Sequence, residues 1–348
     1  MFESIMWKYM NEEGELLMKL IKDRKIREQL ASLKDMKALY FVAHGSSYNA
    51  SASIAPFISR LSKVRTYVYT PSNFRYNCPS IDEENKKTTY VLGISQTGTS
   101  RGVLEALEEA KKKGFKVIGI TAVSGSPLDE LSDLTLDLRC GEEDSNAKTK
   151  GYSSTLTLLM MLGIELSQGV NKEDYYRELE EEVTKLDEVR KRTVRWCKEN
   201  DYGKNMDNLY VIGSGMNFAS AMEGQLKVME TMCIPTMFND IEEFSHGMHR
   251  SLNRGSYVLL LNAGSEKELM EKTRRYLEEK KIDVLELNGE EETDEKNVIY
   301  VGKYEKSASL LSIVTAIQAI SAFVPENNGL DPNRNANNDY TDFVETRV

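Results

Sequence analysis

The stretch LYFVAHGSSYNAS from Leu39 to Ser51 returns in altered form as LYVIGSGMNFASA from Leu209 to Ala221. Each copy begins with an apolar run, passes through a glycine-containing turn and ends in the start of a helical pattern. A second apolar run follows in each half, at Thr89–Ile94 and at Tyr257–Leu261. Because a repeat of this kind means that one structural unit is used twice, we expect two similar domains in tandem.

Each half continues with a charged helical pattern and a further apolar run. The four segments are Val103–Lys113 and Lys116–Thr121 in the first half, and Glu266–Lys280 and Asp283–Leu287 in the second. Near-continuous apolar strands that alternate with amphipathic helices are typical of parallel sheets covered on both faces. The predicted fold class is therefore α/β, with two tandem doubly wound parallel sheets.

The pattern also predicts where these domains begin and end. We expect an N-terminal helix over 1–30, a first domain over 31–170, a connecting helix over 171–200, a second domain over 201–324 and a polar tail over 325–348. The connecting segment is dense in Glu, Lys and Arg, which is typical of a solvated helix face. The tail is polar and rich in Asn, so we expect it to be ordered only where it docks on the protein, closing over the site.

Charge and composition exclude several classes of protein. The 348 residues carry a formal net charge of −10, which disfavours a nucleic-acid binder and an anionic-membrane binder. We find neither a secretory signal nor an apolar run of the ~18 residues that a membrane span needs. The four cysteines are far apart and predict reduced thiols in a cytoplasmic protein.

The segment Ser95-Gln96-Thr97-Gly98-Thr99-Ser100-Arg101 lies between a predicted strand and a predicted helix. Ligands of open α/β sheets bind at this position, and the N–H groups of a helix N-terminus attract anions. A helix cap needs one hydroxyl, and four lie here within six residues. Together with the pair Ser46 and Ser47 after the first strand, they predict a phosphate site. The matching turn in the second half, Asn262–Ser265, has fewer hydroxyls.

The second half carries candidates for proton transfer instead. Glu223, Lys227 and Glu230 have the spacing of helical ion pairs, and His246 follows in the segment Glu242–Arg250. Glu230 and His246 are candidate general acid/base groups, although spacing alone equally fits a surface ion pair and a buried histidine. The pair His246-x-x-His249 has no further Cys or His nearby, so we expect no metal and no cofactor.

Four motifs occur in order along the chain: Gly45–Asn49, Ile94–Gly98, Glu223–Lys227 and Glu243–Gly247. In combination they resemble the tandem sugar isomerase (SIS) domain family, over nearly the whole chain. That family includes the isomerase half of glutamine–fructose-6-phosphate aminotransferase and the fructoselysine and glucoselysine 6-phosphate deglycases. The chain begins Met-Phe-Glu, so we expect no room for the glutaminase domain of the aminotransferase.

The resemblance implies a role for each matched residue. It implies that the substrate phosphate is held by Ser47, Ser95, Gln96, Thr97 and Ser100. It implies that Glu230 moves a proton between C1 and C2 of an open-chain sugar, and that His246 assists ring opening from the neighbouring subunit of a homodimer. The other substrate-binding candidates are Gly45, Ser46, Thr149, Lys150 and Glu243.

One position departs from the family pattern. Where the aminotransferase has a lysine in its C-terminal tail, this chain has Asn338. An amide forms no Schiff base and carries no charge. We therefore expect a deglycase that acts on a 6-phosphorylated amino sugar or Amadori adduct. The alternatives are an aminotransferase-type aldose/ketose isomerase, a deaminase, and a non-catalytic sugar-phosphate sensor.

Overall fold

A computed structural model describes residues 4–304 and 306–348 of the chain. By its internal contacts the chain divides into two compact units. The first-sheet unit comprises Glu15–Glu143, Lys150–Glu180 and Asn335–Val348. The second-sheet unit comprises Met1–Gly14, Asp144–Thr149 and Glu181–Arg334. Two helices, α1 (Ile5–Ile21) and α8 (Lys172–Val183), have residues in both units.

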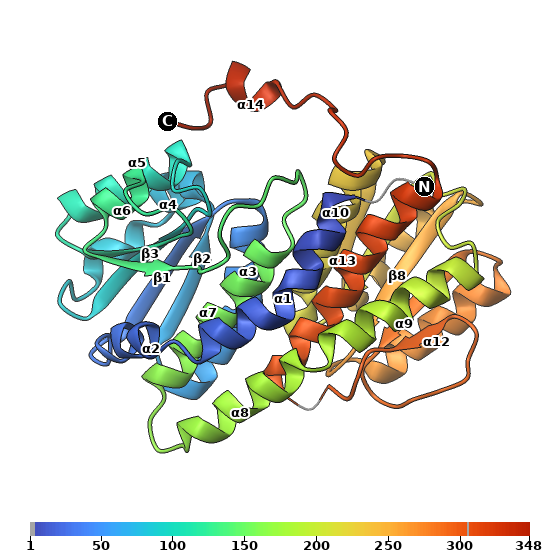
Figure 1. The fold of residues 1–348 in the computed structure, drawn as a ribbon, viewed down its shortest axis with the longest axis horizontal. Coiled ribbons are helices and arrows are strands. Elements are labelled where there is room, and N and C mark those ends of the chain that lie inside the picture. Colours follow the sequence, from blue (N-terminus) through green and yellow to red (C-terminus); the bar gives the residue numbers. More distant parts are fainter. Residues whose placement is uncertain (1–3, 305) are drawn as a thin grey trace. The chain divides into compact units, whose positions relative to one another are not determined.

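The first-sheet unit is built on a parallel sheet of five strands in the order β2-β1-β3-β4-β5. The strands are β1 (Ala38–Ala43), β2 (Arg65–Tyr69), β3 (Thr89–Ile94), β4 (Lys116–Thr121) and β5 (Leu134–Asp137). The helices are α2 (Arg24–Ala31), α3 (Gly45–Ser62), α4 (Pro71–Asn77), α5 (Arg101–Lys112), α6 (Pro127–Leu131), α7 (Lys150–Leu166) and α14 (Tyr340–Phe343). Alternate strand residues such as Tyr40 and Val42 pack against α4, α5 and α6, while α3 and α7 pack together on the sheet's other side (Figure 1).

The second-sheet unit repeats this strand order as β10-β9-β8-β6-β7, again all parallel. The strands are β6 (Asn208–Gly213), β7 (Thr236–Asp240), β8 (Ser256–Asn262), β9 (Asp283–Asn288) and β10 (Val298–Tyr300). The helices are α9 (Leu186–Glu199), α10 (Met216–Met232), α11 (Ile241–His246), α12 (Lys267–Glu279) and α13 (Leu310–Asn327). Because successive strand side chains point to opposite faces, Val211 packs with α9, α10 and α13, whereas Ile212 packs with α11 and α12. The predicted α/β class with two doubly wound parallel sheets is confirmed.

Three helical segments differ from their sequence-based descriptions. The interval 1–30 holds α1 and most of α2, because Asp23 ends the first pattern and caps α2 by accepting from the Ile26 N–H. The interval 171–200 holds α8 and α9 rather than one helix. Pro325, expected in the tail, lies inside the last turn of α13.

Residues Ser307–Asn327, which include α13, form a segment long and apolar enough to cross a membrane. This corrects the expectation that no segment reaches that length. Within the described residues, 89% of its apolar window is buried inside the protein, as in a core helix. Its burial between β6, α9 and α10 accounts for the apolar character of the helix.

Candidate functional site

The strand order of the first sheet reverses between β1 and β3, the position at which open α/β sheets bind ligands. Ala43 and Ile94 are register partners at the ends of these two strands. The segments that follow, Gly45–Ser47 and Ser95–Ser100, therefore begin side by side at one edge of the sheet. The sequence-predicted phosphate residues of both segments belong to the same edge.

The hydroxyl groups of the second segment are paired with one another. Ser95 Oγ lies 2.9 Å from Ser100 Oγ and accepts from the Ser100 N–H at 3.4 Å. Thr97 Oγ1 lies 2.9 Å from Thr99 Oγ1. The segment Ser95–Ser100, which we call the hydroxyl loop, thus gathers four hydroxyls in front of α5.

The alternative interpretation of this loop was a hydroxyl-rich helix cap. Ser100 is the N-cap residue of α5, yet it makes no side-chain cap hydrogen bond. Its hydroxyl is directed at Ser95 instead. The Ser100 side chain therefore does not cap the twelve-residue helix α5, and the Arg101 N–H of its first turn donates to the Thr346 carbonyl at 3.1 Å.

Gly98 fixes the path of the hydroxyl loop. Its φ is +72°, in the region that favours glycine. A Cβ atom at this position would lie 2.1 Å from Ser126 Oγ, so any other residue would collide with the start of α6. The Gly98 carbonyl also accepts from the Leu128 N–H at 3.0 Å, which holds the loop against α6.

Gln96 has a different environment from the loop hydroxyls. Its Nε2 donates to Glu143 Oε2 at 3.3 Å, and the same oxygen accepts from the Gly151 N–H at 3.0 Å. A Cβ atom at Gly151 would lie 2.5 Å from the Gln96 amide, so the glycine leaves room for this position of the Gln96 side chain. The buried Glu143 carboxylate, which the sequence analysis missed, therefore orients Gln96.

We expect the double substitution of Ser95→Ala and Thr97→Ala to weaken binding of fructose 6-phosphate by about 100-fold or more. Hydrogen bonds to a charged group contribute about 1.5–3 kcal/mol each, and two are removed. Isothermal titration calorimetry measures the loss. Ser32→Ala is the matched control, because Ser32 Oγ donates to the Gln29 carbonyl at the end of α2. Equal affinity of the double variant and the wild type would contradict the phosphate assignment.

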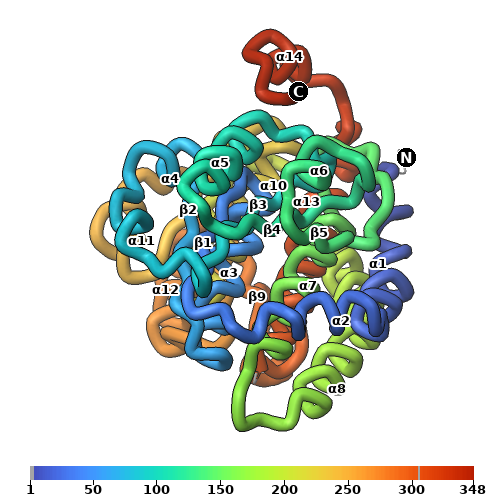
Figure 2. The backbone as a smooth tube through the Cα atoms, turned by 90° about the vertical axis from the view of Figure 1, so that its left-hand side faces the viewer, coloured from blue at the N-terminus to red at the C-terminus, as the bar shows by residue number. Residues whose placement is uncertain are grey.

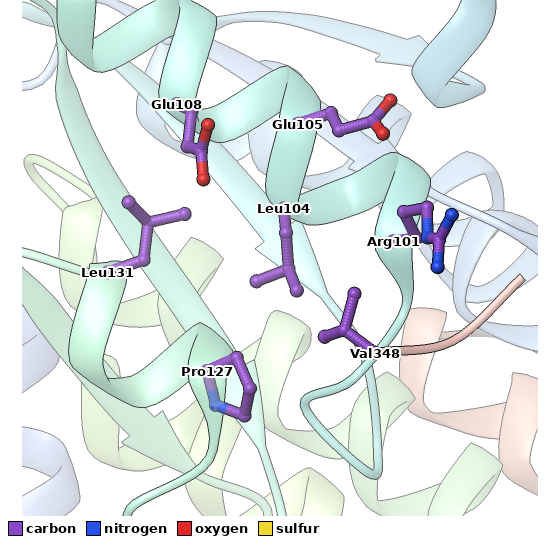
Figure 3. A pocket seen from close by; sticks show the side chains of 7 residues that line it. All are labelled: Arg101, Leu104, Glu105, Glu108, Pro127, Leu131 and Val348. Atoms are coloured by element: carbon purple, nitrogen blue, oxygen red, sulfur yellow. The ribbon is translucent and has the colours of Figure 1, made fainter.

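The C-terminal segment docks on the same loop. Ser100 and Arg347 form an antiparallel bridge, the Arg101 N–H donates to the Thr346 carbonyl at 3.1 Å, and the Val348 N–H donates to the Thr99 carbonyl at 3.1 Å. Figures 1 and 2 show this segment returning past α14 toward α5. Val348 helps to line a pocket of about 380 Å³ (Figure 3). The other lining residues are Arg101, Leu104, Glu105, Glu108, Pro127 and Leu131.

In the second-sheet unit, three charged side chains form a line along α10. Lys227 Nζ lies 2.9 Å from Glu223 Oε1 and 3.4 Å from Glu230 Oε2. The side chains of Glu223 and Lys227 are each 1% exposed, and that of Glu230 is 30% exposed. The interpretation as a surface ion pair is therefore wrong, because two of the three charges are buried where α10 packs on its sheet and on α13.

Glu230 has the electrostatic properties of a proton acceptor with an elevated pKa. Burial raises the pKa of its carboxyl, and the Glu223 carboxylate raises it further, while Lys227 and Lys148 act in the opposite direction. A carboxylate with a raised pKa suits proton abstraction near neutral pH. It also reaches solvent, unlike Glu223.

The histidine candidate lies on α11, which begins at the end of β7. Asp240 caps this helix by accepting from the Glu242 N–H at 2.9 Å. His246 is the last residue of α11, and both His246 and Glu243 are exposed. The alternative of a buried histidine is therefore wrong for His246.

The candidates Thr149 and Lys150 lie in different units. The Thr149 side chain is fully buried, and its carbonyl accepts from Gln318 Nε2 of α13 at 3.1 Å. Lys150 begins α7 and is 6% exposed. The sequence analysis did not select their neighbour Lys148. Its positive charge lowers the pKa of the Glu230 carboxyl. Sequence spacing gave no signal for it, because the two residues are far apart along the chain.

Within residues 4–304 and 306–348, no group of three or more His, Cys, Asp or Glu side chains is placed to hold a metal ion. His249 Nδ1 lies 3.1 Å from the Phe244 carbonyl, so one nitrogen of this ring is already in a hydrogen bond with a neighbouring backbone group.

Comparison with known proteins shows which family this chain resembles. The SIS domain model matches residues 32–165 and 204–324. The glutamine–fructose-6-phosphate aminotransferase (isomerizing) of Thermococcus kodakarensis is 30% identical over 329 residues, which cover 90% of this chain and 53% of the relative. That of Clostridium tetani is 29% identical over 340 residues, which cover 92% and 54%. The chain thus spans about half the length of these curated relatives.

Solved structures share the fold at lower identity. A candidate phosphosugar isomerase from Clostridium difficile 630 superposes with a TM-score of 0.89 at 23% identity, covering 99% of this chain and 98% of the other. The C-terminal domain of glucosamine–fructose-6-phosphate aminotransferase from Francisella tularensis gives a TM-score of 0.82 at 20% identity, covering 96% and 99%. A glucosamine-6-phosphate deaminase from Thermotoga maritima gives 0.76 at 22% identity, covering 96% and 98%.

Proposed function

The chain belongs to the SIS domain family, and on that premise we propose that it is an enzyme acting on a 6-phosphorylated sugar–amine adduct. The products are a free amine and a hexose 6-phosphate. The observation that carries the proposal is the Glu223–Lys227–Glu230 line, which holds one carboxylate of raised pKa at a partly exposed position. The four hydroxyls gathered in the hydroxyl loop support a phosphate site there.

The chemistry needs one base that works at two neighbouring carbons. In the open-chain adduct, C2 is a carbonyl and C1 bears the amine. Glu230 takes the proton from C1 and returns it to C2, while the proton of the amine nitrogen passes to the C2 oxygen, so the C2 carbonyl becomes a hydroxyl and C1 becomes an imine. Water then adds to the imine carbon and the C1–N bond breaks, which releases the amine and the aldose 6-phosphate.

The presence of Asn338 supports cleavage of a sugar–amine bond over synthesis of an amino sugar from ammonia. Its Oδ1 accepts from the Ala336 N–H at 3.2 Å, within a turn that precedes α14. A neutral amide cannot act as a lysine would on a sugar carbonyl. An adduct already contains its C–N bond, so cleavage needs no ammonia delivered to C2.

The second candidate function is that of an isomerase that combines ammonia with fructose 6-phosphate, or of a deaminase that runs the reverse reaction. The observation in its favour is the 30% identity to an aminotransferase. Both candidates use the same proton shift between C1 and C2, so Glu230 serves either. They differ in whether the nitrogen arrives bound to the sugar.

The decisive experiment compares the two substrates directly. We expect a phosphorylated Amadori adduct, tested in a panel of amines, to yield free amine and hexose 6-phosphate at a rate well above that of glucosamine 6-phosphate formation from ammonia and fructose 6-phosphate. Efficient synthesis of glucosamine 6-phosphate, with no amine released from any adduct, would favour the second function. Tight binding of both substrates without turnover would favour the sensor.

We also propose that the active unit is a homodimer in which His246 acts on the partner subunit's substrate. The exposure of His246 and Glu243 on α11 supports this, because both side chains are available to a second chain.

A further inference from the structure

His44 lies in the first-sheet unit, directly after the end of β1. Ala43, the last residue of β1, is the register partner of Ile94, the last residue of β3. His44 and Ser95 are therefore the first residues beyond two neighbouring strands, at the point where the strand order of the sheet reverses. The hydroxyl loop begins at the same edge.

The imidazole ring of His44 packs against the first turn of α5. A Cβ atom at Gly102 would lie 3.0 Å from His44 Nε2 and 3.6 Å from His44 Cε1, so the glycine leaves room for the ring. The same Cβ atom would lie 3.3 Å from the Cβ of Pro71, which begins α4. Since Gly102 follows Ser100 by two residues, the ring lies beside the helix end that the hydroxyl loop leads into.

The His44 ring is available to a ligand. Within the described residues, its two nitrogens have no hydrogen-bond partner. His44 is the N-cap residue of α3, yet its side chain makes no cap hydrogen bond, and the residue is exposed. The ring of His249, by contrast, already has a backbone carbonyl beside its Nδ1.

The candidate phosphate residues carry no positive charge. They are serine, threonine and glutamine side chains, which offer neutral donors only. Arg101, which follows the loop, lies 3.3 Å from Glu345 Oε2, so its charge is shared with a carboxylate. A hydrogen bond from a charged donor to phosphate is about twice as strong as one from a neutral donor. A protonated His44 supplies such a donor beside the loop.

We propose that His44 is a further phosphate-binding residue, which donates a hydrogen bond to the substrate phosphate from a protonated imidazole. The inference rests on the proposed function, because it takes the hydroxyl loop as the place of that phosphate. The proton comes from water, and no covalent bond to the substrate forms or breaks. The free protein and the complex therefore differ by one proton at this ring.

The environment of the ring makes this proton measurable near neutral pH. Partial burial lowers the pKa of His44 below its ordinary value of 6.5, so the ring of the free protein is mostly neutral at pH 7. A phosphate dianion beside the ring favours the imidazolium and raises that pKa. Between the two pKa values binding takes up one proton, so affinity falls by about tenfold for each unit of increasing pH.

The charged side chains on the elements around His44 are engaged with one another. The pairs on α4, α5 and the C-terminal segment are Arg75–Glu105, Arg75–Glu109 and Arg101–Glu345, at 2.5, 2.7 and 3.3 Å. Arg347 meets the hydroxyl loop through its backbone bridge with Ser100. At the end of β2, the hydrogen bond with Cys78, together with burial, raises the pKa of Tyr69 to about 12, so this phenol stays neutral.

The first test measures fructose 6-phosphate binding by isothermal titration calorimetry at pH 7 and pH 8, where the phosphate is mostly dianionic. We expect the dissociation constant of the wild type to rise by about tenfold between these two values. His44→Gln should bind about 10-fold or more weakly than the wild type at pH 7, with a dissociation constant that no longer changes with pH.

The matched control for this test is Lys63→Gln. It removes a positive charge at the opposite end of α3, where Lys63 is exposed and donates to the Arg60 carbonyl. Both the affinity and its pH dependence should stay at the wild-type values in this variant. Wild-type affinity in His44→Gln, or the full wild-type pH dependence in that variant, would overturn the role of His44.

A second measurement follows the proton itself and needs no turnover. The chain has three histidines, and the ring signals of His44 are assigned in 15N-labelled protein by their loss in His44→Gln. We expect the titration midpoint of His44 to rise by about one pH unit or more when fructose 6-phosphate is bound. A midpoint that does not rise would overturn the proposal.

The two measurements separate this inference from the proposed function. A raised midpoint without amine release from any adduct supports the role of His44, and only the proposed reaction fails. Amine release with an unmoved midpoint overturns the role of His44 and leaves the proposed reaction standing. His44→Asn replaces His44→Gln if the glutamine variant does not fold.

Discussion

Substitution of Glu230 by glutamine is expected to lower turnover by about 100-fold or more while the substrate still binds. Glutamine keeps the size and the hydrogen-bonding shape of the side chain but cannot accept the C1 proton. The proposed phosphate contacts belong to the hydroxyl loop, which the substitution leaves unchanged, so kcat should fall and the dissociation constant of fructose 6-phosphate should not. Steady-state kinetics and calorimetry on the same preparation measure the two quantities. Wild-type turnover in Glu230→Gln would exclude Glu230 as the base.

The same variant tests the shared site. If His246 acts on the partner subunit's substrate, mixing inactive Glu230→Gln with inactive His246→Ala creates one site with both wild-type residues. Part of the activity should then return after subunits exchange. Proven exchange without recovery would assign complete sites to single chains.

Substitution of Lys227 by methionine is expected to destabilise the protein by about 3–5 kcal/mol, because it leaves buried carboxylate charge without its cation. Lys227 and Glu223 are each 1% exposed, so water cannot take over the role of the lost partner. The loss is measured as a lowered midpoint in urea-induced unfolding at pH 7.

Two variants separate this charge effect from simple loss of packing. In Glu223→Gln with Lys227→Met, the buried charge is removed together with its partner, and much of the stability should return. Lys191→Met removes a lysine whose side chain is 64% exposed, and its effect should stay below about 1 kcal/mol. A Lys227→Met variant as stable as Lys191→Met would contradict the assignment of a buried ion pair.

The sequence predicted the fold best where a periodic pattern of apolar residues and a glycine-containing turn occur together. The apolar run Thr89–Ile94 coincides with β3, and Lys116–Thr121 coincides with β4. Strands buried on both faces are mostly apolar, so their limits are visible in the sequence. The break between α8 and α9 was not visible, because the sequence there contains neither proline nor glycine. There, Lys185 donates its N–H to the Glu182 carbonyl in a turn between the helices.

The candidate site was predictable only in part, for a physical reason. The hydroxyl loop is contiguous, and its excess of Ser and Thr can be counted in the sequence. Whether Ser100 caps α5 or faces Ser95 depends on a rotamer, and the burial of Lys227 depends on α13 packing over α10. The segment Asp144–Thr149 is joined to the end of α10 by the hydrogen bonds of Arg334, which comes from a third part of the chain.

The docking of Thr346 to Val348 on the hydroxyl loop bears on how the protein should be handled in the laboratory. A purification tag fused after Val348 would begin in the pocket beside α5, which Arg101 also lines. The tag would then compete with the backbone pairing that now holds Thr99 and Arg101 in place. Sugar-phosphate affinities obtained with such a fusion would report partly on the tag, so binding should be measured after it has been cleaved off.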